Sequence, residues 1–183
     1  MNEVLLLVAG LIGGALNTLA GGGSFIVFPA LLAVGVPPVL ANASNTYAAL
    51  PGYVSGAVGL WKDVVAYRDR LLVYGLIAAV FGYAGAELLL HVSDAQFSVV
   101  VPWLMLFAVV LFAFGGRINA FVASRAGSSR GAKTAGAAVL LLILAAVSIY
   151  GGFFNAGLGV LLLAFLTLAG IANIHAANGL KLV

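Results

Sequence analysis

The sequence predicts an all-α fold, a bundle of helices that crosses a membrane several times. Of the 183 residues, 64% are hydrophobic and 7% are charged, and the mean hydropathy is +1.21. A soluble domain carries about 25% charged residues, so a water-soluble fold of this size is excluded. Two of the apolar regions are broken by glycine at corresponding places. We therefore predict a polytopic membrane helix bundle with two sequence repeats.

The first apolar region is interrupted by Gly21, Gly22 and Gly23. As one straight helix, residues 4–34 would be about 46 Å long, which exceeds the roughly 30 Å hydrocarbon core of a bilayer. Two alternatives follow: one strongly tilted, broken helix, or a helical hairpin whose tip lies inside the membrane. The hairpin gives an odd number of passes before the second repeat and so inverts that repeat. We favour the inverted arrangement, in which each repeat opens with a glycine-broken hairpin.

Three later segments, 39–61, 71–90 and 97–114, are each about as long as one crossing, which takes roughly 20 helical residues. Small residues recur at helical spacing within the middle segment, which lets a neighbouring helix backbone approach closely. They are Gly75, Ala79, Gly82 and Gly85.

The C-terminal region repeats the start of the chain at an offset of about 136 residues, with a slip of one. Counterparts of the later helices of the first half do not follow it. The predicted organisation is a first repeat over 1–115, a basic loop over 116–134 and an incomplete second repeat over 135–183.

Positive charge predicts the orientation in the membrane. The loop 61–70 holds three basic residues, and the loop 115–134 holds four and no acidic residue. Two crossings lie between these loops, joined by a connection without Lys or Arg, so both loops fall on the same side. Because basic loops stay inside, we expect both to be cytoplasmic and the chain to be a multi-pass protein of the inner membrane.

The glycine break is the first candidate site. A helix that begins after Gly23 directs the N–H groups of Ser24, Phe25 and Ile26 into the break, and these donors suit an anion. A similar break recurs at Asn155 to Gly159, and paired breaks of this kind indicate the binding site of a transporter. The alternative is a tight turn or a close helix contact that needs no ligand.

A polar cluster follows in the next segment. Asn42, Asn45 and Thr46 share one helical face, which we expect to point to protein or water rather than to lipid. Hydrogen bonding between helices is the alternative. Under two-fold pairing, Asn178 corresponds to Asn42, and Lys181 corresponds to Asn45. Lys181 is then either an anion partner or an interfacial residue.

Further polar residues allow two interpretations each. Asn17 and Asn155 lie close to the breaks, where each either contributes an amide to the cavity or caps a broken helix. Glu87 and His91 are one helical turn apart near the end of their span. They form either a proton-coupling pair, since His titrates near neutral pH, or an interfacial pair.

The residues that would support catalysis or metal binding do not form a recognisable pattern. The chain has no cysteine, its two histidines lie far apart, and no catalytic motif occurs. We therefore expect no enzyme, no metal and no cofactor. The basic loops lack the aromatic residues of a nucleic-acid surface, so nucleic acid is not expected as a partner.

Two signatures resemble a known family. The run AGGGSFIVFPALL at 20–32, with Gly35 and ANASNT at 41–46, resembles the first signature of the TauE/SafE sulfite-exporter family, the toluenesulfonate-uptake permease type. GFFNAGLG at 152–159 and ANGLK at 177–181 resemble the second, although Leu158 replaces the middle glycine.

The resemblance implies a secondary transporter for sulfite, an organosulfonate or a related small organic anion. The alternatives are a non-transporting membrane subunit that partners a sulfur-metabolism enzyme, and a passive anion channel. The expected partners are a small anion and the lipid bilayer, and homo-oligomerisation is left open. The predicted substrate-binding residues are Gly21, Gly22, Gly23, Ser24, Asn42, Asn45, Thr46, Asn155, Gly157, Asn178 and Lys181.

Overall fold

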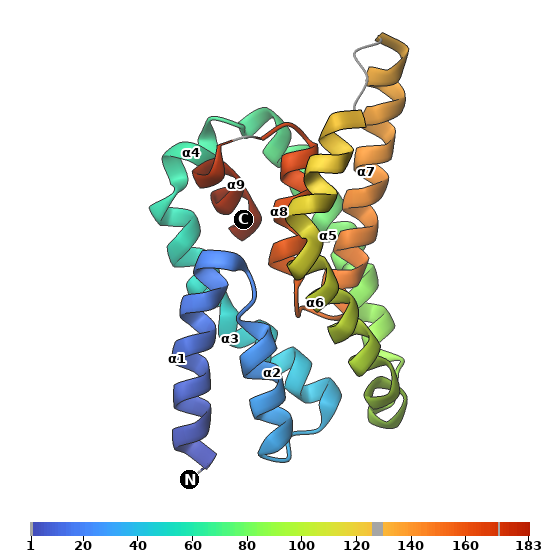
Figure 1. The fold of residues 1–183 in the computed structure, drawn as a ribbon. Helices are drawn as coiled ribbons and strands as arrows, with labels where there is room; N and C mark the ends of the chain where they lie inside the picture. The colour runs from blue at the N-terminus through green and yellow to red at the C-terminus, as the bar shows by residue number, and fades with distance from the viewer. Residues whose placement is uncertain (1, 126–129, 172) are drawn as a thin grey trace.

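A computed structural model describes residues 2–125, 130–171 and 173–183, which form nine α-helices and no strand (Figure 1). The all-α prediction is confirmed for these residues. The helices are α1 (Asn2–Ala20), α2 (Ser24–Ala33), α3 (Pro38–Gly59), α4 (Trp61–Val65), α5 (Arg68–Leu90), α6 (Asp94–Arg125), α7 (Arg130–Phe153), α8 (Leu158–Leu168) and α9 (Ile174–Leu182).

Within the described residues, two helical segments are long and apolar enough to cross a membrane: α5, with 23 residues, and Gly136–Phe153 of α7, with 18. Shorter apolar segments occur in α1, α2, α6 and α8. Helix α3 covers most of the predicted crossing 39–61 and has 22 residues, but it is not among these apolar segments. It carries the polar cluster around Asn42.

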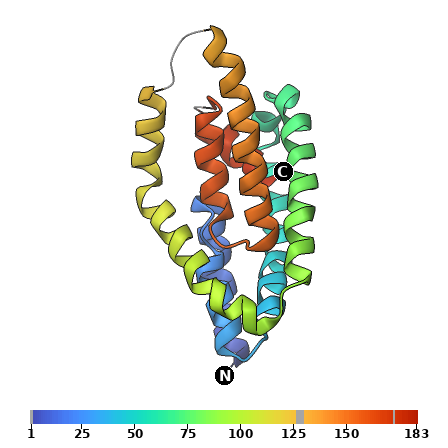
Figure 2. The ribbon, with the colours of Figure 1, turned by 90° about the vertical axis from the view of Figure 1, so that its right-hand side faces the viewer.

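Residues 4–34 form a helical hairpin rather than one tilted helix. The chain turns between α1 and α2 at Gly21, which has φ +75°, and α2 begins at Ser24. The α7–α8 hairpin likewise turns at Gly157, with φ +81°. The two hairpins enter from opposite ends of the molecule, and their tips lie at mid-height (Figures 1 and 2).

The most extensive helix packing joins α5 to α7. A Cβ atom on Gly85 would overlap the carbonyl oxygen of Ile149, and one on Gly152 would overlap that of Gly82. The predicted close approach is therefore confirmed at Gly82 and Gly85. Gly75 differs, since a Cβ there would have nothing within 4 Å.

Aromatic side chains pack the second hairpin turn against the first hairpin. Phe154, in the α7–α8 turn, is fully buried and makes an edge-to-face contact with Phe28 of α2, with ring centroids 5.6 Å apart. Phe97 of α6 also contacts the ring of Phe154, with ring centroids 6.1 Å apart. Contacts of this geometry add to the stabilisation from apolar burial. They bring the two breaks together.

The termini of the long helices α5, α6 and α7 lie at two opposite ends of the molecule (Figure 1). Helix α4, the start of α5, the end of α6 and the start of α7 lie at one end of the molecule, and the α5–α6 connection lies at the other (Figure 1). The described parts of both basic stretches therefore lie at the same end (Figure 1), as their sequence positions require. That this end faces the cytoplasm stays a prediction.

Candidate functional site

The tips of the two hairpins touch backbone to backbone. A Cβ on Gly21 would lie 2.7 Å from the Cα of Gly159, and a Cβ on Gly159 would lie 2.6 Å from the Cα of Gly21. Gly23 permits another close contact, because its Cβ would overlap the carbonyl oxygen of Gly13 in α1. Gly21 and Gly23 thus have the packing role that was the alternative to ligand binding.

Helix α3 is bonded to both hairpins through two amides one turn apart. Asn45 Nδ2 donates to Ser24 Oγ at 2.9 Å, and Asn42 Nδ2 donates to the carbonyl oxygen of Phe153 at 3.0 Å. Both asparagines are only 3% exposed. Since a buried amide without a partner is costly, these bonds fix the register of α3 against both breaks.

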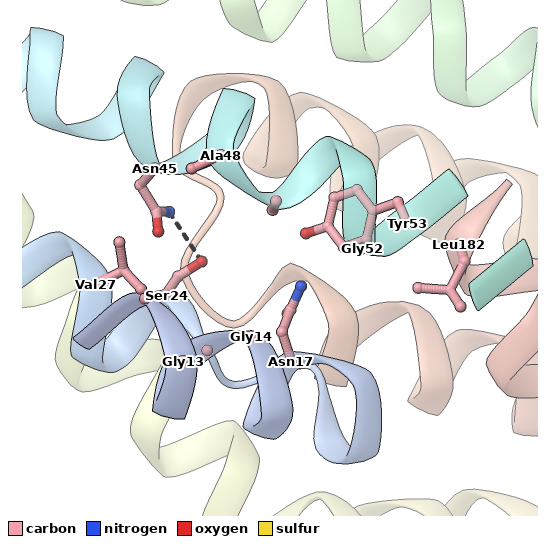
Figure 3. A pocket seen from close by; sticks show the side chains of 13 residues that line it. Gly13, Gly14, Asn17, Ser24, Val27, Asn45, Ala48, Gly52, Tyr53 and Leu182 are labelled. Carbon is pink, nitrogen blue, oxygen red and sulfur yellow. Dashed lines mark hydrogen bonds between the residues drawn. The ribbon is translucent and has the colours of Figure 1, made fainter. Parts of the chain in front are cut away.

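A cavity of ≈ 170 Å³ lies between α1, α2 and α3, beside the Ser24–Asn45 pair (Figure 3). A single water needs only roughly 10–15 Å³ of such space, so a small polyatomic ion fits. Much of the wall consists of small residues, which are Gly10, Gly13, Gly14, Gly23, Ala48, Ala49 and Gly52. Its polar side chains are Asn17, Ser24, Asn45 and Tyr53.

Of the predicted binding residues, the structure brings Gly23, Ser24 and Asn45 into the cavity wall. Gly21 and Gly22 are buried in the adjoining turn, and Asn42 points to the second hairpin. Thr46 is a correction to the predicted cluster: it is exposed and its hydroxyl donates to Asn42 O of its own helix, at 2.9 Å.

The predicted residues of the second half lie outside this cavity. Asn155 and Gly157 are buried at the α7–α8 turn, and Asn155 Nδ2 has no hydrogen-bond partner among the described residues. Lys181 Nζ donates to Asn178 Oδ1 at 3.0 Å. Helix α9 reaches the cavity through Leu182 instead.

The first turn of α2 also differs from the prediction. The N–H of Phe25 donates to Gly22 O at 3.1 Å, and that of Ile26 donates to Gly23 O at 3.0 Å. These two donors are used within the turn and do not point free into the break. The side chain of Ser24, rather than a row of backbone N–H groups, is what α2 presents beside the cavity.

From the sequence, one cavity residue, Tyr53, was missed, and two roles were left open for another, Asn17. Tyr53 lies eight residues after Asn45, on the same face of α3, and its hydroxyl points into the cavity (Figure 3). The small residues Ala49 and Gly52, which lie between Asn45 and Tyr53 in the sequence, are the signal that could have identified Tyr53 as a cavity residue. Asn17, for which helix capping was the alternative, points its amide into the cavity.

Glu87 and His91 lie at the exposed end of α5. His91 Nδ1 donates to the backbone carbonyl oxygen of Glu87 at 2.8 Å, so the imidazole is bonded to the main chain and not to the carboxylate. Both side chains are exposed and neither lines the cavity.

The fold and the cavity define a polytopic helical membrane protein whose two broken hairpins meet inside the bundle. The sequence pattern described as "Sulfite exporter TauE/SafE" matches residues 6–183. The chain belongs to this family. No solved structure matches it.

Curated relatives agree with this membership. The chain is 30% identical over 182 residues to a "Probable membrane transporter protein" of Haemophilus influenzae, covering 98% of this chain and 68% of the relative. It is 27% identical to the Sinorhizobium "Probable membrane transporter protein ORF9", covering 96% and 65%, and 28% identical to Escherichia coli K12 YfcA, also a "Probable membrane transporter protein", covering 98% and 64%. The chain thus spans about two thirds of the length of these relatives.

Proposed function

We propose that this protein is a secondary transporter that carries a small anion, such as sulfite or an organosulfonate, across the bacterial inner membrane. The observation that carries the proposal is the cavity beside the first break, where polar side chains from three helices converge. The family description names sulfite export, and the relatives are named transporters rather than enzymes.

The cavity chemistry suits an oxyanion. The amides of Asn17 and Asn45 and the hydroxyls of Ser24 and Tyr53 supply neutral hydrogen-bond donors. Gly23 and Ser24 also place the N-terminus of α2 at the wall, and the helix dipole gives this end a partial positive charge. An oxyanion with several acceptor oxygens can use donors from different helices at once.

Matched backbone conformations support two repeats. Positive φ angles occur at Gly21 and Gly157, and again at Gly35 and Gly170. These pairs are separated by 136 and 135 residues, which repeats the offset and the one-residue slip found in the sequence. The opposite entry of the two hairpins supports the inverted relation (Figure 1). Rocking of one repeat against the other at the Gly21–Gly159 contact would then expose the cavity to alternate sides.

Transport is tested with labelled sulfite in proteoliposomes of the full-length protein. We expect saturable uptake that is lost in Ser24→Ala and Asn45→Leu. Uptake should be retained in Ser55→Ala, which removes an exposed hydroxyl from α3, the helix that carries Asn45. Unchanged uptake in both cavity variants would refute the proposed site. Flux without saturation would assign a channel, and absence of both flux and ligand-dependent stabilisation would assign a non-transporting subunit.

Proton coupling through Glu87 and His91 is a separate part of the proposal. Uptake is measured with and without an imposed proton gradient in Glu87→Gln and His91→Gln. Loss of the gradient dependence with retained binding supports coupling through this pair. Retention of the dependence in both variants assigns the pair to the membrane interface.

A further inference from the structure

We infer that the cavity selects monovalent anions and rejects divalent anions of the same shape; this inference rests on the proposed function. Of the residues that line the cavity, none carries a formal charge. Its polar groups are two amides and two hydroxyls. The site therefore offers hydrogen bonds to an anion but no full countercharge.

Within the described residues, no charged group of the surrounding helices lines the cavity. Helix α4, which contacts α3 and α9, carries Lys62 and Asp63, and neither lines it. Helices α2 and α8 carry no charged or titratable group, and α1 carries only Glu3, in its first turn. In α3, Tyr47 is 77% exposed, and Tyr53 is the hydroxyl already counted in the wall. Asp94 of α6 accepts a hydrogen bond from Val39 N, at the opposite end of α3 from Tyr53.

Along the sequence, the cation nearest to a residue of the cavity wall is Lys181 of helix α9. Lys181 precedes Leu182, which reaches the cavity, but the ammonium group of Lys181 donates to Asn178 Oδ1. His175 lies two residues into the same helix and is exposed. Neither group lines the cavity.

The missing countercharge decides the valence of the ligand. The cost of moving an ion out of water grows with the square of its charge, so a dianion pays about four times the cost of a monoanion. The N-terminus of α2 offers less than the roughly half elementary charge of an open helix end, because two of its N–H groups are bonded within the turn. The neutral donors add hydrogen bonds. This balances a single negative charge far better than two.

For an oxyanion that titrates near neutral pH, the singly charged form is then the transported species. Binding must weaken as the pH rises through the second pKa of the ligand itself, although none of the cavity groups needs to titrate. An anion that stays monovalent throughout must show no such loss.

The test compares two probes of similar shape, methanesulfonate, which stays monovalent, and methylphosphonate, which becomes divalent. Affinities are measured by calorimetry on the full-length protein in detergent, below and above the second pKa of methylphosphonate. We expect methylphosphonate to weaken by about tenfold or more across this range, while methanesulfonate stays unchanged. Equal or tighter binding of the divalent form would overturn the valence rule alone. Failure of both probes to bind at either pH would overturn the proposed anion site as well.

A charge-insertion pair sharpens the test. Ala49→Lys adds a cation to the wall, and Ala49→Met adds a side chain of similar length without charge. We expect the lysine variant to gain affinity for divalent methylphosphonate and the methionine variant to keep the original preference. Lys181→Gln, paired with the exposed Lys62→Gln, checks the premise. A loss of methanesulfonate binding confined to Lys181→Gln would mean that a full countercharge serves the site, and would overturn the inference. If the Ala49 variants do not fold, the two-probe comparison on the unmodified protein decides.

Discussion

Asn45 donates a buried hydrogen bond to Ser24, from Nδ2 to Oγ at 2.9 Å, and so joins α3 to the first residue of the broken helix α2. One turn earlier, Asn42 makes the corresponding connection to the second hairpin at Phe153. One face of α3 is therefore hydrogen-bonded to both glycine-broken hairpins. The cavity lies directly beside the first of these bonds.

The Ser24–Asn45 bond should contribute to stability as well as to binding. Asn45→Ala leaves the buried Ser24 hydroxyl without its donor, and we expect a loss of about 1–3 kcal/mol in the free energy of unfolding. Ser24→Ala and the double variant complete a double-mutant cycle by chemical denaturation in detergent. The double variant should lose less than the sum of the single variants. Strict additivity would show that the two side chains are not coupled.

The Gly21–Gly159 contact should not accept a methyl group. In Gly21→Ala the Cβ meets backbone at 2.7 Å and φ +75° is unfavourable for alanine, so both effects destabilise. Gly159→Ala tests the overlap alone, and Gly35→Ala tests the positive φ alone, since its Cβ would have open space. Thermal unfolding should rank Gly21→Ala as the most destabilised. Gly75→Ala, in open space within α5, should gain up to about 1 kcal/mol through helix propensity.

Tyr53→Phe keeps the ring and removes the hydroxyl that points into the cavity. Because only a ligand contact is lost, we expect substrate affinity to fall about fivefold to tenfold, the effect of losing about 1 kcal/mol of hydrogen bonding, with little change in thermal stability. Tyr47→Phe is the matched control on the exposed face of the same helix. Equal affinities of the two variants would remove Tyr53 from the site.

Asp94 caps α3 from a distant part of the chain. Its Oδ1 accepts a hydrogen bond from Val39 N at 2.9 Å, across 55 residues, and Pro37 and Pro38 cannot provide such a donor. Asp94→Ala should therefore destabilise the protein by about 0.5–2 kcal/mol, the usual cost of losing an N-cap. Denaturant titration checks this. Asp69→Ala, an exposed acid in the first turn of α5, is the control and should cost little.

The sequence alone determined the class of protein, the location of both hairpin turns and the close packing at Gly82 and Gly85. These features depend on local properties, since apolar length sets the crossings and glycine marks the turns and close contacts. The same local signals singled out Ser24 and Asn45, which the structure joins by a hydrogen bond at the cavity wall. Helical periodicity, however, shows only which residues share a face of one helix.

The tertiary structure decided which polar residues meet. Thr46 shares a stripe with Asn42 but bonds its own helix, Tyr53 completes the cavity, and Lys181 pairs with Asn178. The bond from Asn42 to Phe153 joins residues 111 positions apart. Such contacts arise from the docking of one hairpin on the other, and the energy that selects them comes from surfaces that no single segment contains.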